Sequence, residues 1–439
     1  MVVMSTVLWF RRDLRTADLP ALVAAAEGDG EVLACYVLDP RLKVSSGSRR
    51  LQFLYDSLRE LNDALDGRLF VTRGRPETRI SAVAAAIGAS AVHISDDFSP
   101  FGRRRDDAVR AALGETPLIA TGSAYLVSPG RVTKDDGTPY KVFTPYYRRW
   151  QEHGWRGPEK SGPDSARWIT PADVTAAGGG AGVDIPDPGT ALSIPAGEAE
   201  AKRRWTTFVG ADLAGYADDR NRPDLDLTSR MSAYLHFGNI HPRTMARDLA
   251  GREEGPAAYL RELAFRDFYA TVLAEWPRSS WWNWNTAFDS IRVDDDAEAQ
   301  SHFERWKDGR TGFPIVDAGM RQLRETGFMH NRLRMVTASF LVKDLHLPWQ
   351  WGARWFLDQL LDGDIASNNH GWQWAAGCGT DAAPYFRVFN PNTQAKKFDP
   401  SGDYVRRWVA ELGTPDYPEP IVDHRSEREE ALRRYGEIG

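Results

Sequence analysis

The sequence has little of what several protein classes need. Its 439 residues include only two cysteines, Cys35 and Cys378, which lie far apart in the chain. They exclude a disulfide framework and predict reduced thiols in a cytoplasmic protein. No apolar run approaches the roughly 20 residues of a membrane-spanning helix, so we expect no membrane partner. His and Cys do not occur at metal-ligand spacing, which predicts no metal site. No Ser-His-Asp or Cys-His nucleophile arrangement is legible either.

The chain also lacks an excess of positive charge. Its 55 Lys and Arg against 61 Asp and Glu give a net charge of −6. The protein as a whole is therefore not a basic nucleic-acid binder, and a nucleic-acid partner would need a local basic groove. Tryptophan, by contrast, is abundant, with sixteen residues. So many indoles indicate stacking or interface roles, although a helical core could absorb several of them.

The first 126 residues alternate between short apolar runs and amphipathic segments. This alternation predicts a doubly wound, Rossmann-like parallel sheet with helices on its faces. No Gly-x-Gly-x-x-Gly follows the first strand, so the usual dinucleotide fingerprint is absent. The predicted strands are 7–10, 32–38, 69–71, 92–94 and 118–120, and the predicted helices are 19–26, 49–65, 77–87 and 103–113.

Periodicity fades after this region and then returns as a helical pattern. Residues 127–198 form the predicted linker, in which 143–150 is an aromatic-basic helix. The Ala-, Gly- and Pro-rich segment 171–197 is expected to run extended over the surface. Residues 199–439 are predicted to be all-α. The fold class is therefore an α/β domain (1–126), a long linker (127–198) and a C-terminal helical domain (199–439).

One polar and aromatic stretch, 362–381, is the clearest sign of a site. It combines two acids, an Asn pair, two Trp and a Gly-rich turn. It is too polar to pack alone and too aromatic for a solvated loop. The mixture suits a pocket for a flat, partly polar ring, held by aromatic faces and by polar groups at its edge. A buried polar turn that joins helices is the alternative.

Two further segments carry polar groups at helical spacing. A Thr/Ser cluster at 228–232 precedes an apolar run, which predicts a helix N-cap. Its N–H groups and hydroxyls, with Arg230, could hold a diphosphate, or simply start a helix. Glu262, Phe265, Arg266 and Tyr269 share one helix face, which indicates the border of a site. An exposed i,i+4 Glu–Arg pair is the alternative.

A third helix face is predicted at Phe328, Asn331, Arg332 and Met335. An amide, a cation and two apolar groups suit a nucleobase pocket, in which the amide pairs with base edges and the cation with a phosphate. Later in the chain, basic residues cluster near aromatic ones. This suits a bound strand with a flipped base, and a solvated charged face is the alternative. The basic residues are Arg387, Lys396, Lys397, Arg406 and Arg407.

Four segments of the sequence resemble the DNA photolyase/cryptochrome family, and most closely its bacterial class I cyclobutane pyrimidine dimer photolyases. They are 9–15 (WFRRDLR), 228–232 (TSRMS), 312–323 with 329–335, and 362–394. They follow the family's order and span nearly the whole chain. The resemblance implies light-driven repair of DNA by electron transfer from excited, reduced FAD to a flipped-out dimer, in a monomer. A cryptochrome-like photoreceptor is the main alternative, and a non-photochemical flavoprotein is a weaker one.

The resemblance also implies roles for individual residues. Arg334 would pair with Asp362, and Asn368 would face flavin N5. The implied catalytic residues are Glu262, Asn331, Met335, Trp372 and Trp349. The implied cofactor residues are Tyr216, Thr228, Ser229, Arg230, Met231, Ser232, Arg266, Arg334, Asp362, Asp364 and Asn368. The implied DNA or dimer contacts are Phe265, Arg332, Trp374, Arg387, Lys396 and Lys397.

Two positions depart from the family pattern. Phe265 stands where photolyases usually carry Trp, and Asp296 stands where the outermost Trp of the redox chain is found. Trp351, Trp355, Trp306 or Trp284 could substitute for the latter. For an antenna pigment, the family favours 8-hydroxy-5-deazaflavin over methenyltetrahydrofolate here. The loop 96–103 is similar to that of deazaflavin binders, and no Cys-Lys pair occurs near 280–282. The other strand-end candidates are Phe10, Arg11, Asp39 and Arg50, and the alternative is that these loops bind nothing.

Overall fold

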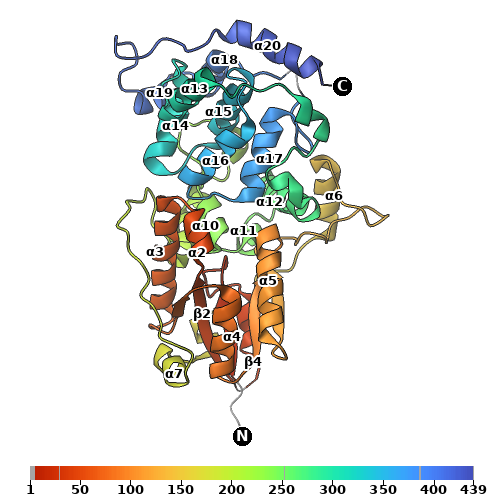
Figure 1. Cartoon of the computed structure of the whole chain (residues 1–439), viewed down its shortest axis with the longest axis vertical. Coiled ribbons are helices and arrows are strands. Elements are labelled where there is room, and N and C mark those ends of the chain that lie inside the picture. Colours follow the sequence, from red (N-terminus) through yellow and green to blue (C-terminus); the bar gives the residue numbers. More distant parts are fainter. Residues whose placement is uncertain (1–4, 29, 252, 385–386, 439) are drawn as a thin grey trace.

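The computed structural model describes residues 5–28, 30–251, 253–384 and 387–438. In these residues a parallel sheet with its helices forms one half of an elongated molecule, and a bundle of helices forms the other (Figure 1). No helix in these ranges combines the length and hydropathy that a bilayer crossing requires. The predicted fold class, an α/β domain followed by a helical domain, is confirmed.

The sheet has six parallel strands: five follow the order β3-β2-β1-β4-β5, and the two-residue β6 (Arg167–Trp168) pairs with β2 beside them. Strands β2 and β4 pair with β1 on its opposite sides, so the strand order reverses at β1. At such a reversal α/β folds place their ligands. All five predicted strands are present, most with longer ends. The strands are β1 (Ser5–Phe10), β2 (Glu31–Leu38), β3 (Phe70–Arg73), β4 (Ala89–Asp96) and β5 (Leu118–Ser123).

Helices cover both faces of this sheet. The four predicted helices are present, and one short helix, α2, was not predicted because only Pro40 and the capping Asp39 mark it. The Asp39 carboxylate accepts the Arg41 N–H at 2.9 Å, which fixes the first turn of α2. The helices are α1 (Pro20–Ala25), α2 (Pro40–Val44), α3 (Ser48–Ala64), α4 (Pro76–Ala86) and α5 (Pro100–Leu113).

The linker departs in part from the extended chain that was predicted. Residues 171–176 form α7 (Pro171–Ala176) instead. Thr170 and Asp173 make a reciprocal capping box there, and Val174 is fully buried, so local capping and one apolar contact stabilise this turn. The other linker elements are α6 (Phe143–His153), η1 (Pro163–Ser165) and β6 (Arg167–Trp168), which pairs with β2.

The C-terminal half is helical, as predicted. Helix α17 packs against α12, α15 and α16 and is central to the bundle. The helices are α8 (Glu198–Ala211), α9 (Tyr216–Asp219), α10 (Ser232–Phe237), α11 (Pro242–Asp248), α12 (Glu254–Glu275), α13 (Ala297–Asp308), α14 (Pro314–Thr326), α15 (Asn331–Lys343), α16 (Trp349–Gln359), α17 (Ile365–Ala376), α18 (Pro391–Phe398), α19 (Asp403–Trp408) and α20 (His424–Gly436), with 3₁₀ turns η2 (Pro277–Ser280) and η3 (Thr286–Ser290).

The two halves share one hydrophobic core. Phe53 of α3 lies against Phe237 and Tyr234 of α10, with ring centroids 5.2 and 5.5 Å apart. Gly238 ends α10 in the left-handed region, at φ 71°, where a Cβ would collide with the carbonyl of Arg12. Only glycine permits both this backbone conformation and this close approach. The position of α10 on the α/β domain therefore depends on Gly238.

Replacing Gly238 with Ala should lower the free energy of unfolding by about 1–3 kcal/mol, because it combines left-handed strain with a backbone clash. Thermal unfolding measures this change. Gly210→Ala in α8 is the control, since a Cβ there meets no other atom within 4 Å. That control should leave stability unchanged or raise it, and equal melting temperatures for both variants would contradict the account.

Candidate functional site

A cavity of about 510 Å³ lies within the helical domain. Helices α10, α12, α15 and α17 line it, together with the segments that precede α10 and α17. The structure places all of the predicted cofactor residues on its walls, with several of the predicted catalytic and dimer residues. These are Tyr216, Thr228, Ser229, Arg230, Met231, Ser232, Glu262, Phe265, Arg266, Asn331, Arg334, Met335, Asp362, Asp364, Asn368, Trp372 and Trp374.

Two carboxylates stand on the segment that leads into α17. Asp362 forms the expected ion pair with Arg334, at 2.9 Å, and Arg334 is held in turn by the carbonyl of Met329. Asp364 accepts the Ser367 N–H at 3.0 Å and so caps α17. The carboxylates are therefore fixed at the start of the central helix, where they can accept hydrogen bonds from a polar ring edge or from hydroxyls.

Asp364 also reaches the α/β domain. Its carboxylate lies 2.6 Å from the guanidinium of Arg12, which follows β1. Burial opposes ionisation, but the charge of Arg12 keeps the pKa of Asp364 well below its usual range. Sequence reasoning missed Arg12 and His236, although Arg12 lies inside the motif 9–15. Asp364 is thus an ionised group shared between the two domains.

The Thr/Ser cluster does not cap a helix as predicted. Helix α10 begins at Ser232, and its cap residue, Met231, makes no side-chain hydrogen bond. The Ser229 hydroxyl instead bonds the Tyr259 hydroxyl at 2.7 Å. Thr228 Oγ1 is buried without a hydrogen-bond partner among the described residues, and Arg230 is held at φ 54°. A buried orphan hydroxyl and a strained backbone mark a place where a ligand supplies the missing partner.

These features fit a flavin nucleotide. The orphan Thr228 hydroxyl and Arg230 suit a phosphate, and the two carboxylates suit hydroxyls and a ring edge. Asn368 lies on α17 between them and the aromatic wall. Its amide nitrogen donates to the Ala353 carbonyl at 3.0 Å and to Asn369 at 2.8 Å. Asn368 lines the cavity as an uncharged polar group.

The predicted face of α12 lies on the cavity wall. Glu262 pairs with Arg220 at 2.8 Å, and burial raises the pKa of Glu262 although that positive charge opposes the rise. Arg220 was not predicted. Arg266 donates to the carbonyls of Ala124 and Leu235 at 2.6 and 3.2 Å, so it is not the partner of Glu262. The alternative of a surface Glu262–Arg266 pair is therefore wrong.

The predicted face of α15 is only partly correct. Asn331 and Met335 line the cavity. Phe328 lines it too, but from the segment before α15, which begins at Asn331. Arg332 does not line it, since its guanidinium donates to Asn221 at 2.6 Å and covers the ring of Phe398. Helical spacing grouped these residues because it cannot show where the helix begins.

The indoles of the expected redox chain lie at different depths. Trp372 is buried on the cavity wall, whereas Trp349 lies beyond it, and its Nε1 donates to Asn283 at 2.9 Å. Asp296 caps α13 by accepting the Ala299 N–H, which gives it a structural role. The ring centroids of Trp306 and Trp372 lie 6.0 Å apart. Trp306, one of the four suggested substitutes for the outer Trp, is thus in contact with a ring of the cavity wall.

The predicted basic residues Arg387, Lys396 and Lys397 do not line the cavity. All three are exposed, the lysines on α18 and Arg387 in the segment that precedes it. They can therefore meet a polyanion on the surface, but the structure does not bring them to the ring site.

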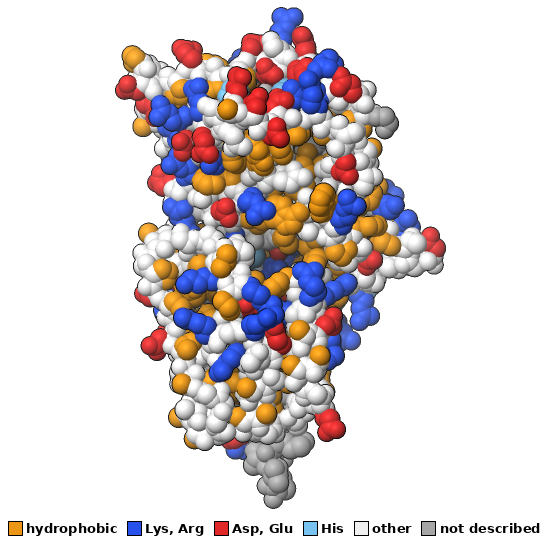
Figure 2. All heavy atoms as spheres, in the orientation of Figure 1, with side chains coloured by type: hydrophobic (Ala, Val, Ile, Leu, Met, Phe, Trp, Pro, Cys, Tyr) orange, Lys and Arg blue, Asp and Glu red, His pale blue; other side chains and the backbone are white. Residues whose placement is uncertain are grey.

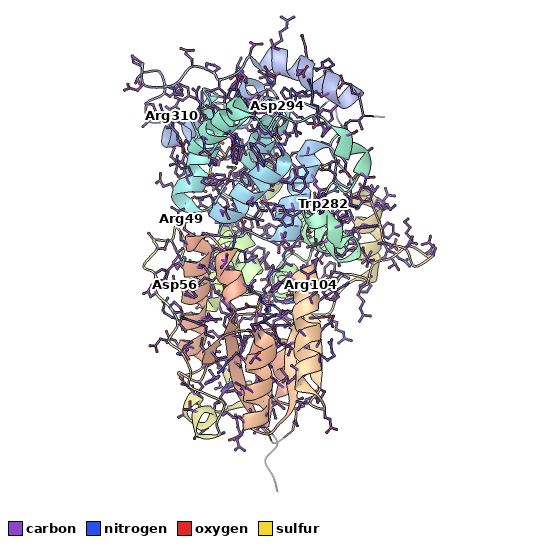
Figure 3. The ribbon with its side chains drawn as sticks, in the orientation of Figure 1. Arg49, Asp56, Arg104, Trp282, Asp294 and Arg310 are labelled. Carbon is purple, nitrogen blue, oxygen red and sulfur yellow. The ribbon has the colours of Figure 1, made fainter. Side chains whose placement is uncertain are left out.

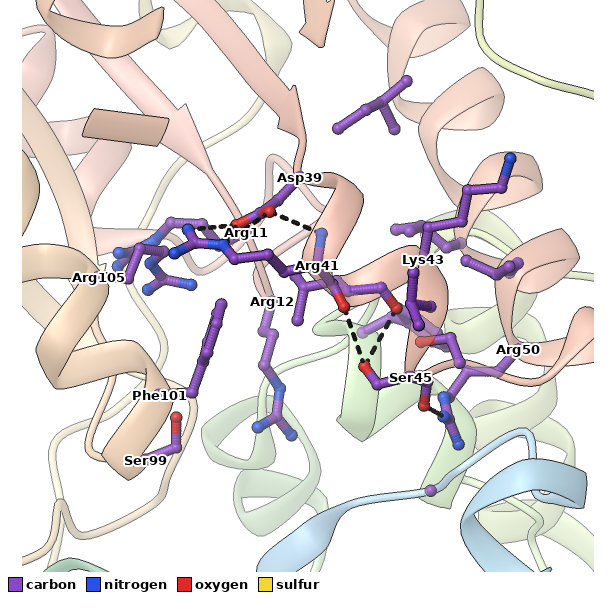
Figure 4. Close-up of a pocket in the computed structure, with 18 of the residues that line it drawn as sticks. Arg11, Arg12, Asp39, Arg41, Lys43, Ser45, Arg50, Ser99, Phe101 and Arg105 are labelled. Carbon is purple, nitrogen blue, oxygen red and sulfur yellow. Dashed lines mark hydrogen bonds and ion pairs between the residues drawn. The ribbon is translucent and has the colours of Figure 1, made fainter. Parts of the chain in front are cut away.

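A second cavity, of about 800 Å³, lies where the carboxyl edge of the sheet faces the helical domain. Figure 2 shows a hollow between the two halves with Lys, Arg and hydrophobic side chains around it, and Figure 3 places Trp282 and Arg104 above and below this region. The close-up in Figure 4 shows Arg12 extending from the end of β1 toward the helical part. The predicted strand-end residues Phe10, Arg11, Asp39 and Arg50 line this cavity. The segment 96–103 is only partly the predicted loop, because α5 begins at Pro100; Asp97 and Ser99 before α5 and Phe101 in its first turn line the cavity too. Arg12, His236 and Asp364 line both cavities.

A parallel α/β domain is joined here to a helical domain whose cavity of about 510 Å³ suits a flavin nucleotide. This combination defines a two-domain flavin-nucleotide protein. A DNA photolyase family model matches residues 6–164, and a model described as the FAD binding domain of DNA photolyase matches residues 259–414. The chain is 38% identical to a deoxyribodipyrimidine photo-lyase of Streptomyces griseus, over 95% of this chain and 96% of that protein. It is 36% identical to one of Halobacterium salinarum, over 98% of each. The chain belongs to the DNA photolyase family.

Solved structures agree with this assignment. A bacterial class III photolyase from Agrobacterium tumefaciens superposes with a TM-score of 0.88 at 32% identity, covering 100% of this chain and 98% of that one. A cryptochrome of Synechocystis superposes with a TM-score of 0.87 at 26% identity, covering 99% of both chains. The predicted family and the FAD-binding domain are thus confirmed, and membership of class I stays a prediction.

Replacing Arg12 with Gln removes the ion pair of Asp364. Because the native pKa of Asp364 is depressed, its stabilising effect is present above its unfolded pKa of about 3.9 and is lost as the pH falls toward the native pKa. R12Q should therefore lower the free energy of unfolding by about 2 kcal/mol near neutral pH and show a weaker loss of stability on acidification. Urea unfolding at a series of pH values measures both effects. R12K should retain most of the stability, and the exposed Arg104→Gln is the control; an unchanged acid slope in R12Q would contradict the account.

Proposed function

We propose that this protein repairs cyclobutane pyrimidine dimers in DNA with light. One observation carries the proposal: the residues that suit a flavin and the residues that suit a base lie on the walls of a single cavity. The full-length relatives named deoxyribodipyrimidine photo-lyase support it. When bound, photoexcited reduced FAD supplies the electron that splits the dimer and receives it back. The chain's own part is to position both partners and to exclude water.

The cofactor half of the cavity would be organised by charge. Arg334 holds Asp362, and Arg12 holds Asp364, so that both carboxylates would be fixed toward the ring edge and the ribityl hydroxyls. The segment 228–232, with Tyr216 and Arg266 nearby, would take the phosphates and ribityl chain. The uncharged amide of Asn368 would face N5 and favours an anionic reduced ring over a protonated one.

The substrate half would hold the two linked pyrimidines of a dimer that has flipped out of the DNA helix. Glu262 and Asn331 would hydrogen-bond the base edges, while Phe265, Met335 and Trp374 would pack against the faces. Arg220 orients Glu262 from the side. The outward Arg332 and the exposed Arg387, Lys396 and Lys397 would contact phosphates, which position a strand without reading its sequence.

Two Trp would carry electrons that restore the reduced cofactor. Trp372 lies on the cavity wall, and Trp349, which does not line the cavity, is buried in the same hydrophobic cluster. Trp306 would extend this chain outward, because its ring is next to that of Trp372, but it is fully buried. Trp351 would then be the next redox residue: the Phe303 ring, which is too hard to oxidise itself, contacts the rings of Trp306 and Trp351 at 5.8 and 5.3 Å.

The larger cavity would hold an antenna pigment. Arg73, Lys43 and Arg354 line it and make no ion pair with a described acid, so it suits a ligand with an anionic tail. We retain 8-hydroxy-5-deazaflavin as favoured over methenyltetrahydrofolate. A photolyase of Sulfolobus tokodaii, 29% identical and solved with two FAD molecules, is described with a novel light-harvesting cofactor. A flavin-sized ring in this position is consistent with that description.

The proposal also includes class I membership, a monomeric state and a cytoplasmic location. It places the domain boundaries at 1–126, 127–198 and 199–439. The second candidate function is a photoreceptor that binds FAD with little or no repair. Phe265 and Asp296 favour it, since both depart from the photolyase pattern, and the similarity to a cryptochrome structure is compatible with it. Asn368 and Met335, which match the photolyase pattern, oppose it.

Glu262→Ala should weaken dimer binding by about 10- to 100-fold, because a charge-assisted hydrogen bond to the bases is lost and Arg220 is left unpaired. Dimer repair per absorbed photon at subsaturating DNA measures it, after checking that FAD content is unchanged. Glu275→Ala at the exposed far end of α12 is the matched control. Full repair by Glu262→Ala would refute the assigned role.

DNA binding should weaken as salt rises, because phosphate contacts release counterions. If Lys396 and Lys397 each contact one phosphate, their double Ala variant should reduce the slope of log affinity against log salt by about 2. Titrations of one labelled duplex at several salt concentrations give this slope. Lys202→Ala on α8 is the control, and an unchanged slope in the double variant would remove the lysines from the interface.

A further inference from the structure

The wall of the cavity at Phe265 is two rings deep. Phe143, the first residue of α6, lies face to face with Phe265, with ring centroids 3.5 Å apart and planes 7° from parallel. Phe143 is 1% exposed and does not line the cavity, whereas Phe265 does. The two side chains come from segments that are 122 positions apart in the sequence. We call them the aromatic pair.

Phe143 is held in place from two sides. Its backbone N–H donates to the Asp381 carboxylate at 3.1 Å, and the Thr380 hydroxyl donates to the carbonyl of Lys141. These acceptor and donor groups lie on the turn after α17, the helix that carries Trp374. At the far end of α6, Trp150 Nε1 donates to the buried Asp267 of α12 at 3.1 Å. Helix α6 is therefore fastened to both helices that carry the cavity's aromatic walls, beside α12 in Figure 1.

Phe143, the buried member of the aromatic pair, is also supported by neighbouring side chains. Phe143 stacks on Tyr147 at 5.6 Å and meets Phe268 edge-on at 5.7 Å. The guanidinium of Arg261 lies 5.1 Å from the Phe143 centroid and 5.9 Å from the Phe265 centroid. A Phe265 ring in van der Waals contact with such a fixed neighbour can neither tilt nor recede. When a flat base packs on the free face of Phe265, binding then costs less entropy, because the Phe265 ring is already ordered.

We propose that Phe143 is a specificity-determining positioning residue that holds Phe265 as a rigid, flat wall for the flipped dimer. This inference rests on the proposed function, because it needs a base to meet the wall. Two stacked phenyl rings would thus replace the single indole of other photolyases. The two rings are stacked face to face, so Phe at position 265 and Phe at position 143 act as a unit.

Binding in the dark separates this role from simple core packing. The FAD-loaded full-length protein is titrated with a labelled oligonucleotide that carries one thymine dimer and with its undamaged counterpart. The ratio of the two dissociation constants is the dimer preference. Phe143→Leu should lower that preference about five- to tenfold, because stacking on a wall that can move is weaker. Val272→Ala, a fully buried position in the same cluster that does not line the cavity, is the control and should leave the preference unchanged.

A second pair of variants tests the unit directly. Phe265→Trp should lower the dimer preference, because the larger ring disturbs the stack on the fixed Phe143. Adding Phe143→Leu should then raise it again, so that the same substitution has opposite signs in the two backgrounds. A Phe143→Leu variant with the wild-type preference, or one that lowers the preference equally in both backgrounds, would overturn the inference alone. A wild-type protein with no preference for the dimer would overturn the proposed function, and this inference with it.

Discussion

The ion pair between Arg12 and Asp364 is the interaction on which the arrangement of the site depends. It joins the end of the first strand to the start of the central helix, across 352 positions of sequence. Asp364 caps that helix with the same carboxylate and lines both cavities. Moving Asp364 would therefore shift α17 and, with it, Asn368, Trp372 and the turn after the helix. A partly buried pair of this kind fixes geometry more than it adds stability.

The same constraint explains why the two cavities share one wall. The parallel sheet presents its switch point to the helical domain, so a ligand at the sheet edge lies next to the cavity inside the bundle. Light collected in one cavity would reach an electron donor in the other without any moving part. The chemistry then requires only that the donor and the dimer be held close in a dry place. The stacked Phe143 and Phe265, Trp374 and the ion-paired carboxylates supply that rigidity.

The sequence predicted the sheet and the cavity residues well for different reasons. Strands and helices followed from periodicity, which local sequence determines. The cavity residues followed from family resemblance, and Arg334 with Asp362 paired as expected. Periodicity failed at the ends of helices, because a single residue decides where a helix begins. Phe328 precedes α15, and neither Thr228 nor Ser229 caps a helix. Arg12, Arg220 and Phe143 could not be assigned, because their partners are distant in the chain and only the folded structure brings them together.

The most direct test of the account is light-dependent repair by the wild-type protein. Purified, photoreduced protein is mixed with an oligonucleotide carrying one thymine dimer and kept in the dark or under near-ultraviolet to blue light. The account predicts loss of the dimer only in the light, with one site per protein molecule. If FAD is bound and photoreduces while the dimer persists, the photolyase account is contradicted, and a photoreceptor built on the same cavity becomes the better explanation.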